Sequence, residues 1–422
     1  MVNTNSFKKY FDGKLIVKYI KSNFSDSAYS LSNLLIASLD GFFLNILLVR
    51  FLTLEDLGNY KIFFAIINIL IITSINGLNA SVTKAVAKKY RIFFIKATKI
   101  STLFSFIGSV ILVILAFTYY KSSDIKIALL FASAVIPVYF GFNIWESYLY
   151  GEKQFKKILI FNAILAVVRF LVCGLILFFY KNYLFTILAY ILIVAVFNVI
   201  FYFTIYRKIK YDKVEVQTEK ELIKHGANLT GSSTISVIAS NVERLILEGV
   251  ANAATVGIYS IVNIFPSFIK NGLKNLIIVP TVKLAARPEK DNRRILKRAI
   301  FILLAVGIII FVIFWFITPW LLRFFFKVED QQTILYGQLI MVPIIFLPIN
   351  LTIKYMASYQ GSGSSILKLS PFLEGIKVAL FAVFIPFFKI NGIIIALVLG
   401  EIISFIILVT WFFISNKKFD VK

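Results

Sequence analysis

Residues 183–206 read YLFTILAYILIVAVFNVIFYFTIY and contain no charged side chain. An apolar helix of about 20 residues is long enough to cross the hydrocarbon core of a bilayer. Similar runs recur along the chain, near residues 27–50, 58–83, 98–120, 125–150, 158–180 and 183–206, and again near 227–250, 257–284, 299–325, 333–359, 366–388 and 391–415. Alternation with a period of two residues is not evident, which disfavours a β-barrel. The sequence therefore predicts an all-α polytopic membrane protein with about twelve transmembrane helices.

The composition agrees with this fold class and excludes several others. Of the 422 residues, 59% are hydrophobic and 16% are charged, whereas about one quarter of the residues of a soluble domain are charged. A soluble enzyme, a disordered chain and a secreted disulfide scaffold are therefore excluded. The single cysteine, Cys173, has no intrachain partner, and the single histidine, His225, argues against a multi-histidine metal site. We expect no bound cofactor.

The distribution of basic residues predicts the orientation in the membrane. The formal net charge is +24, and most Lys and Arg residues lie in the connectors between apolar runs. With the N-terminus in the cytoplasm, 31 of the 45 Lys and Arg residues lie on the cytoplasmic side and eight on the other side. Cytoplasmic loops carry such an excess of basic residues. Both termini are therefore predicted to be cytoplasmic.

A short motif is repeated at the start of the second and the eighth apolar run. Leu57–Tyr60 reads LGNY, and Val256–Tyr259 reads VGIY. Further similarities follow in the same order: Asn76–Leu78 with Asn271–Leu273, Thr83–Ala87 with Thr281–Ala285, and Tyr148–Gly151 with Ser358–Gly361. The offset of about 200 residues contains six apolar runs, an even number. The two halves should therefore enter the membrane in the same direction.

This repeat predicts the domain organisation. We expect an interfacial cytoplasmic segment, a six-helix lobe, a basic cytoplasmic linker, a second six-helix lobe and a cytoplasmic tail, over residues 1–25, 26–206, 207–225, 226–415 and 416–422. The two lobes should be pseudo-symmetric around a central cavity. Transporters with such repeats place the substrate between the halves and alternate access by rocking one against the other.

The Gly-x-Tyr motif that opens the second span of each half resembles the polysaccharide flippases of the MATE-like superfamily, known as the Wzx type in O-antigen systems. The Tyr-x-x-Gly motif that closes the fourth span, Tyr148–Gly151, is also similar to that of these proteins. The resemblance implies translocation of undecaprenyl-diphosphate-linked oligosaccharides from the cytoplasmic to the periplasmic leaflet of the bacterial inner membrane. It implies a role in O-antigen or lipopolysaccharide synthesis without catalysis, alongside a polysaccharide polymerase and a chain-length regulator.

Charged side chains inside membrane spans are costly, so they are candidates for function. The predicted substrate-binding cations are Arg169, Arg244, Lys270, Lys274, Lys354 and Lys377. Arginine can bind phosphate with two parallel hydrogen bonds, which makes Arg169 and Arg244 the first choices. The alternative for these two arginines is a buried ion pair with Glu146 or Glu243.

The spacing of two lysines is a separate indication of an anionic ligand. Lys270 and Lys274 are four residues apart, so they lie on one helical face and repel each other. A visiting diphosphate or acidic sugar would relieve this repulsion. The alternative is that the helix ends early and both lysines extend to water. Lys377 is a weaker candidate because Glu374, three residues earlier, is expected to pair with it.

Three carboxylates are candidates for ion coupling: Asp40, Glu243 and Glu374. Asp40 lies in the middle of the first span, where a lone carboxylate could exchange protons. In MATE-type drug exporters a first-span aspartate serves cation coupling, so the resemblance supports the same role. The alternative is an inert Asp40 that accepts hydrogen bonds from Ser38 or Asn33.

The principal alternative function is an ion-coupled multidrug exporter of the MATE type. Six intramembrane cations against five anions suit cationic drugs poorly. An ATP-driven flippase is disfavoured because residues 226–233, GANLTGSS, have Ser232 where a phosphate-binding loop needs lysine. A polymerase or ligase is disfavoured because the chain has no large external loop.

Overall fold

The computed structural model describes residues 13–120, 123–209, 216–285, 289–359 and 363–415. All regular secondary structure within these ranges is helical. The N-terminal half contains α2 (Gly13–Phe51), α3 (Leu54–Leu70), η1 (Ile71–Ser74), α4 (Leu78–Ala87), α5 (Phe93–Thr118), α6 (Ser123–Gly141), α7 (Trp145–Gly151), α8 (Phe155–Tyr180) and α9 (Tyr183–Tyr206). The C-terminal half contains α10 (Val216–Ala239), α11 (Val242–Val250), α12 (Ala253–Val262), α13 (Ile264–Ala285), α14 (Glu289–Phe326), α15 (Gln331–Leu339), η2 (Val342–Ile345), α16 (Leu347–Tyr359), α17 (Gly363–Phe388) and α18 (Ile390–Ser415).

The predicted multi-pass helical fold is confirmed. Ten helical segments of the described residues are long and apolar enough to cross a membrane, and the bent pair α12–α13 is an eleventh. The predicted run 227–250 corresponds to parts of α10 and α11, which carry Glu243, Arg244 and Glu248 and do not pass the same test. The expected count of about twelve is reached when α10 and α11 are taken together as one polar span.

The predicted interfacial segment, cytoplasmic linker and cytoplasmic tail fall partly or wholly outside the described residues. Residues 1–12, 210–215 and 416–422 are among those not described. From Gly13 onward, the predicted interfacial segment belongs to the same helix as the first span, α2. Likewise α10 begins at Val216, inside the predicted linker.

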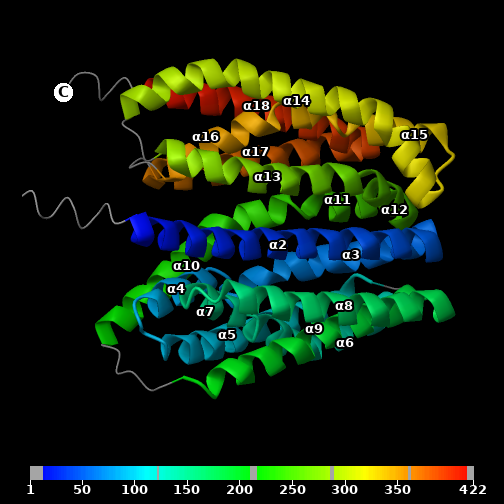
Figure 1. Cartoon of the computed structure of the whole chain (residues 1–422). Coiled ribbons are helices and arrows are strands. Elements are labelled where there is room, and N and C mark those ends of the chain that lie inside the picture. Colours follow the sequence, from blue (N-terminus) through cyan, green and yellow to red (C-terminus); the bar gives the residue numbers. More distant parts are fainter. Residues whose placement is uncertain (1–12, 121–122, 210–215, 286–288, 360–362, 416–422) are drawn as a thin grey trace, which may run out of the picture.

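The helices form two groups with a layer between them. Figure 1 shows α4–α9 on one side, α13–α18 on the other, and α2, α3, α11 and α12 between the two groups. The start of α2 and the end of α18 lie at the same end of the molecule, on the left of Figure 1. An even number of membrane crossings requires this arrangement.

The second and fourth spans of each half are interrupted, as is the polar span formed by α10 and α11. The second span changes from α3 to η1 and then α4, with Ile75 at a φ of 53°. The eighth span bends by 45° between α12 and α13. The fourth span is divided into α6 and α7, and the tenth into α15, η2 and α16. Broken helices leave backbone groups free, and membrane proteins tolerate them where they line a cavity or are buried in protein.

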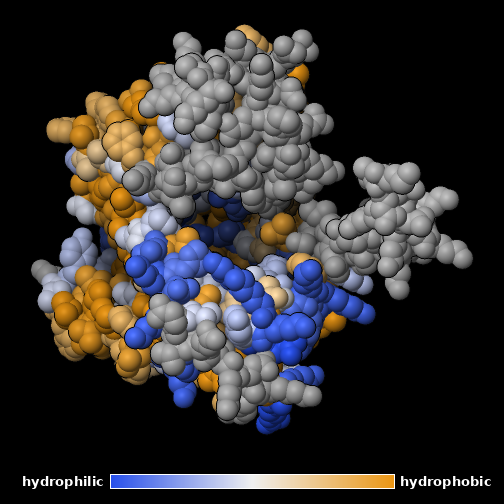
Figure 2. Space-filling view, turned by 90° about the vertical axis from the view of Figure 1, so that its left-hand side faces the viewer, coloured by the Kyte–Doolittle hydropathy of each residue, from blue (hydrophilic) through white to orange (hydrophobic). Residues whose placement is uncertain are grey.

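Hydrophobic packing between the two halves is most extensive at one end. One cluster of buried side chains includes Leu57 and Tyr60 from the N-terminal half and Val256 and Tyr259 from the C-terminal half. Two further clusters are separate from each other: one around Trp145 in the N-terminal half, which also takes in Leu222 of α10, and one around residues 349–356 in the C-terminal half. The end where the cores are separate is on the left of Figure 1, and Figure 2 shows hydrophilic residues and a hollow there.

At the opposite end, α3 and α12 are in backbone contact. A Cβ added to Gly58 would lie 1.8 Å from the carbonyl oxygen of Ala253, and one added to Gly257 would lie 2.1 Å from that of Leu54. Only glycine permits so close an approach. The repeated Gly-x-Tyr motif therefore closes this end of the molecule through its glycines.

Candidate functional site

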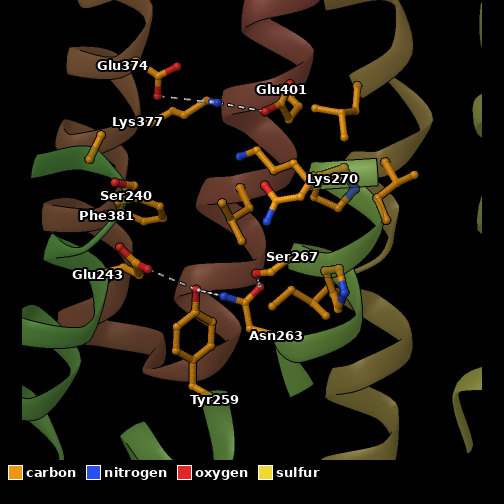
Figure 3. Close-up of a pocket in the computed structure, with 18 of the residues that line it drawn as sticks. Ser240, Glu243, Tyr259, Asn263, Ser267, Lys270, Glu374, Lys377, Phe381 and Glu401 are labelled. Atoms are coloured by element: carbon orange, nitrogen blue, oxygen red, sulfur yellow. Dashed lines mark hydrogen bonds and ion pairs between the residues drawn. The ribbon is translucent and has the colours of Figure 1, made fainter. Parts of the chain in front are cut away.

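A cavity of about 280 Å³ lies within the C-terminal half. Its polar lining comes from residues 240–274, which include α11, α12 and the first half of α13, and from α17 and α18, and Figure 3 shows these side chains pointing toward one another. The charged residues of the lining are Glu243, Arg244, Lys270, Lys274, Glu374, Lys377 and Glu401. Most of the cations predicted from the sequence are thus brought together.

A chain of ion pairs occupies one wall. Glu374 Oε1 lies 3.2 Å from Lys354 Nζ, and Glu374 Oε2 lies 3.8 Å from Lys377 Nζ. Lys377 Nζ also lies 2.8 Å from Glu401 Oε1, and Asn350 donates to Glu401 Oε2 at 2.6 Å. The pairing of Glu374 with Lys377, expected from their spacing, is confirmed. This chain of alternating charges, from α16 through α17 to α18, compensates Lys354 and Lys377.

Lys270 and Lys274 on α13 are not compensated in this way. Lys270 is exposed to the cavity, and Lys274 is partly exposed. Within the described part of the chain, neither lysine forms an ion pair or a side-chain hydrogen bond. Counting Lys354 beside the lining, five described cations face three described carboxylates. The cavity therefore carries an excess of positive charge, centred on α13.

A second polar network lies deeper, next to the α3–α12 contact. Tyr259, from the repeated motif, donates to Glu243 Oε1 at 3.4 Å, and Asn263 donates to the Tyr259 hydroxyl at 3.3 Å. Arg244 Nη1 lies 3.6 Å from the same Glu243 oxygen. This is the buried Arg244–Glu243 pair considered from the sequence. The other carboxylate oxygen of Glu243 and the Nε of Arg244 are buried without a hydrogen-bond partner.

Arg169 and Asp40 lie in the N-terminal half and bind each other. The Arg169 guanidinium donates to the Asp40 carboxylate and, at 3.0 Å, to the Tyr190 hydroxyl. The alternative partners expected from the sequence were wrong: Glu146 accepts from Asn162 at 3.2 Å instead, and Asp40 pairs with Arg169 rather than with Ser38 or Asn33. Neither residue lines the cavity.

The sequence model of a family described as polysaccharide biosynthesis proteins matches residues 24–280, more than half of the chain. The chain belongs to this family. The resemblance to polysaccharide flippases of the MATE-like superfamily is thereby confirmed. No curated protein matches the sequence.

Solved structures of transporters share the fold. A multidrug resistance MATE family transporter of the MOP superfamily, in an inward-facing conformation, is 15% identical, with a TM-score of 0.67 over 91% of this chain and 96% of that one. An outward-facing structure is also 15% identical, with a TM-score of 0.57 over 94% and 95%. A MOP superfamily transporter from Pyrococcus furiosus, described as having a binding pocket of reverse polarity, is 14% identical, with a TM-score of 0.59 over 92% and 94%. The fold is therefore that of two-lobed membrane transporters.

Two polar residues near these networks had no role assigned from the sequence. Glu401 was recognised only as an intramembrane anion, yet it anchors Lys377. Lys61 was one of the eight basic residues counted on the outer side of the membrane, but it lies within α3, is partly buried, and donates to Asn45. The position of Lys61 could have been inferred from the sequence, because this lysine directly follows the Gly-x-Tyr motif within a long apolar run.

The chemistry of the cavity suits the binding of an anion. Its ends differ, with lysines at one end and the Tyr259–Asn263 hydrogen bonds at the other. Among the residues that the structure describes, no group of His, Cys, Asp and Glu could hold a metal ion. Lysines bind phosphate as mobile point charges. The arrangement can therefore hold an anionic group close to the middle of the fold.

Proposed function

We propose that this protein translocates an oligosaccharide linked to undecaprenyl diphosphate from the cytoplasmic to the periplasmic leaflet of the bacterial inner membrane. Membership of a polysaccharide biosynthesis family and the fold of membrane transporters support this proposal. O-antigen or lipopolysaccharide synthesis is the proposed setting, with a polymerase and a chain-length regulator acting on the product. The observation that carries the proposal is the uncompensated pair Lys270 and Lys274.

A diphosphate would supply the counter-charge that this pair lacks. Both lysines have flexible side chains that can follow an anion, and Arg244 lines the same cavity. The cavity of about 280 Å³ is near the lower limit for small-ligand sites. It suits the diphosphate and the adjoining sugar, while the lipid tail stays in the bilayer. Arg169, Lys354 and Lys377 then act mainly by holding carboxylates, which differs from the direct binding expected from the sequence.

The contacts between the halves support alternating access. With the basic connectors in the cytoplasm, the hollow of Figure 2 opens toward the leaflet in which the substrate is made. Release outside requires separation of α3 from α12 at Gly58 and Gly257. The halves rock around the cavity as the hollow closes.

Among the three candidates for ion coupling, we favour Glu243. Asp40 is bound by Arg169, and Glu374 is bound by two lysines. Glu243 lines the cavity, which Asp40 does not, and its contacts are long, at 3.6 Å to Arg244 and 3.4 Å to the Tyr259 hydroxyl.

A MATE-type multidrug exporter is the second candidate, since solved transporters of this fold include multidrug resistance proteins. The positive charge of the cavity argues against cationic drugs, because like charges repel. Cationic-drug resistance conferred by the wild-type protein, with no effect on surface glycan, would favour the exporter.

The test is complementation of a bacterial strain that lacks its own flippase. Lys270→Gln/Lys274→Gln should lose surface glycan, whereas Lys270→Arg/Lys274→Arg should retain much of it. Lys156→Gln, which changes an exposed lysine on α8, is the matched control. Full complementation by the double glutamine variant at normal expression would overturn the proposal.

A further inference from the structure

A second concave surface lies on the N-terminal half. This groove between α5 and α9 has a volume of about 680 Å³ and shares no residue with the cavity of the C-terminal half. Leu103, Phe106 and Phe203 in its lining are 67%, 55% and 45% exposed. Such side chains face lipid in a protein of this fold, so the apolar part of the groove is open to the bilayer.

Charge is confined to one end of the groove. Lys96 and Lys99 lie in the first two turns of α5, and Tyr206 ends α9 beside them. Lys96 pairs with Glu219 of α10, while Lys99 is exposed and, among the described residues, forms no ion pair. The groove therefore combines one surplus cation with a long apolar wall.

We infer that this groove binds an acidic membrane phospholipid, with its phosphate at Lys99 and Lys96 and an acyl chain along Leu103, Phe106 and Phe203. Basic pockets between transmembrane helices bind acidic lipid head groups. From Lys99 to Phe106 the helix rises about 10 Å, which places the first part of an acyl chain against the aromatic rings. A zwitterionic lipid, whose own cation balances its phosphate, would leave Lys99 uncompensated.

The same site touches the polar helix α10. Glu219 and a lipid phosphate would share Lys96, so lipid binding alters how the start of α10 is held. Further along, Gly226 of α10 packs against α4, where a Cβ at Gly226 would lie 2.8 Å from Leu78 Cδ2. The lipid phosphate therefore acts at the point where α10 joins the N-terminal half.

The experiment uses the purified full chain in neutral detergent, with phosphatidylglycerol and phosphatidylcholine as probes. Native mass spectrometry and thermal unfolding measure binding. Phosphatidylglycerol should bind and raise the unfolding temperature, and phosphatidylcholine should not. Lys99→Gln should weaken binding about fivefold, as expected for one basic residue against an anionic lipid. Lys156→Gln should leave binding unchanged, and Leu103→Trp, which fills the groove, should weaken it.

A second measurement needs no change at the lysines. In Phe203→Trp, phosphatidylglycerol with brominated acyl chains should quench the added tryptophan fluorescence, and excess inorganic phosphate should not prevent this. Equal binding of both lipids, an effect of Lys156→Gln as large as that of Lys99→Gln, or stronger binding of a polyprenyl phosphate would each overturn the inference. These outcomes leave the role of Lys270 and Lys274 untouched, because the two sites share no residue.

Discussion

The guanidinium of Arg169 in α8 binds the carboxylate of Asp40 in α2, across 129 residues of sequence. The Asp40 side chain is 5% exposed and that of Arg169 is 17% exposed. A buried carboxylate needs such a partner, since removal from water without one is strongly unfavourable. The pair therefore fixes the first span of the N-terminal half to the fifth.

Removal of one member of this pair should destabilise the protein. Arg169→Gln leaves Asp40 buried and uncompensated, which should cost about 3–5 kcal/mol. Arg169→Gln/Asp40→Asn should recover most of that loss because no lone charge remains. Thermal unfolding in detergent provides the measurement. Additive losses in the double variant would show that the two side chains act independently.

Gly400 provides the space that Lys377 occupies. A Cβ at this position would lie 2.8 Å from Lys377 Cγ. Gly400→Val should displace the lysine from Glu401 and destabilise the protein by about 1–3 kcal/mol, as overpacking does. Gly375→Ala is the matched control, since its Cβ would meet nothing within 4 Å. Unfolding temperature and transport should both fall in the first variant and not in the second.

The α3–α12 contact should respond to a larger side chain at Gly58. Gly58→Val cannot keep the observed approach, so cysteines introduced on α3 and α12 should become more accessible to a water-soluble reagent. The native Cys173 is fully buried and will not interfere. Gly41→Ala serves as the control because nothing lies within 4 Å of its added Cβ. Unchanged accessibility in Gly58→Val would contradict a closing role for this contact.

Topology reporters should test the orientation. Fusions after residues 215 and 290 should report the cytoplasm, and a fusion after residue 328 should report the periplasm. The structure relates the last position to an earlier one, since Arg50 donates to the carbonyl oxygen of Phe325 at 3.0 Å. A reporter after Phe51 should therefore give the same signal as one after residue 328. A periplasmic signal at residue 290 would refute the orientation.

The helices could be predicted from the sequence because their cause is local. An apolar run of sufficient length must satisfy its backbone hydrogen bonds internally. The pairing of Glu374 with Lys377 was predictable for the same reason, since a separation of three residues places both on one helical face. Prediction from hydrophobicity is less reliable for α10 and α11, which are less apolar. A span that faces protein on several sides need not be uniformly hydrophobic.

Long-range partners could not be predicted in this way. For Arg169, the partner considered as an alternative was Glu146, which is closer in sequence, whereas the packing of α2 against α8 selects Asp40. Glu401 joins Lys377 only because α17 and α18 lie side by side. Lys61 was placed at the surface because its helix was expected to start at residue 58, and the helix starts at Leu54. The first two cases depend on which helices are neighbours, and the third depends on where a helix begins.

The contact of Gly58 with Ala253 and of Gly257 with Leu54 has the form of an isologous interface. Position 58 of the first repeat meets the counterpart of position 54 in the second, and the reverse is also true, with the same offset of 199 residues in both cases. This reciprocity is the signature of a two-fold symmetric homodimer. Two copies of a single ancestral half, inserted into the membrane in the same direction, would already have been able to form this contact with each other. Gene duplication and fusion would then have freed the two halves to diverge, one keeping the Asp40–Arg169 pair and the other acquiring the lysines of α13.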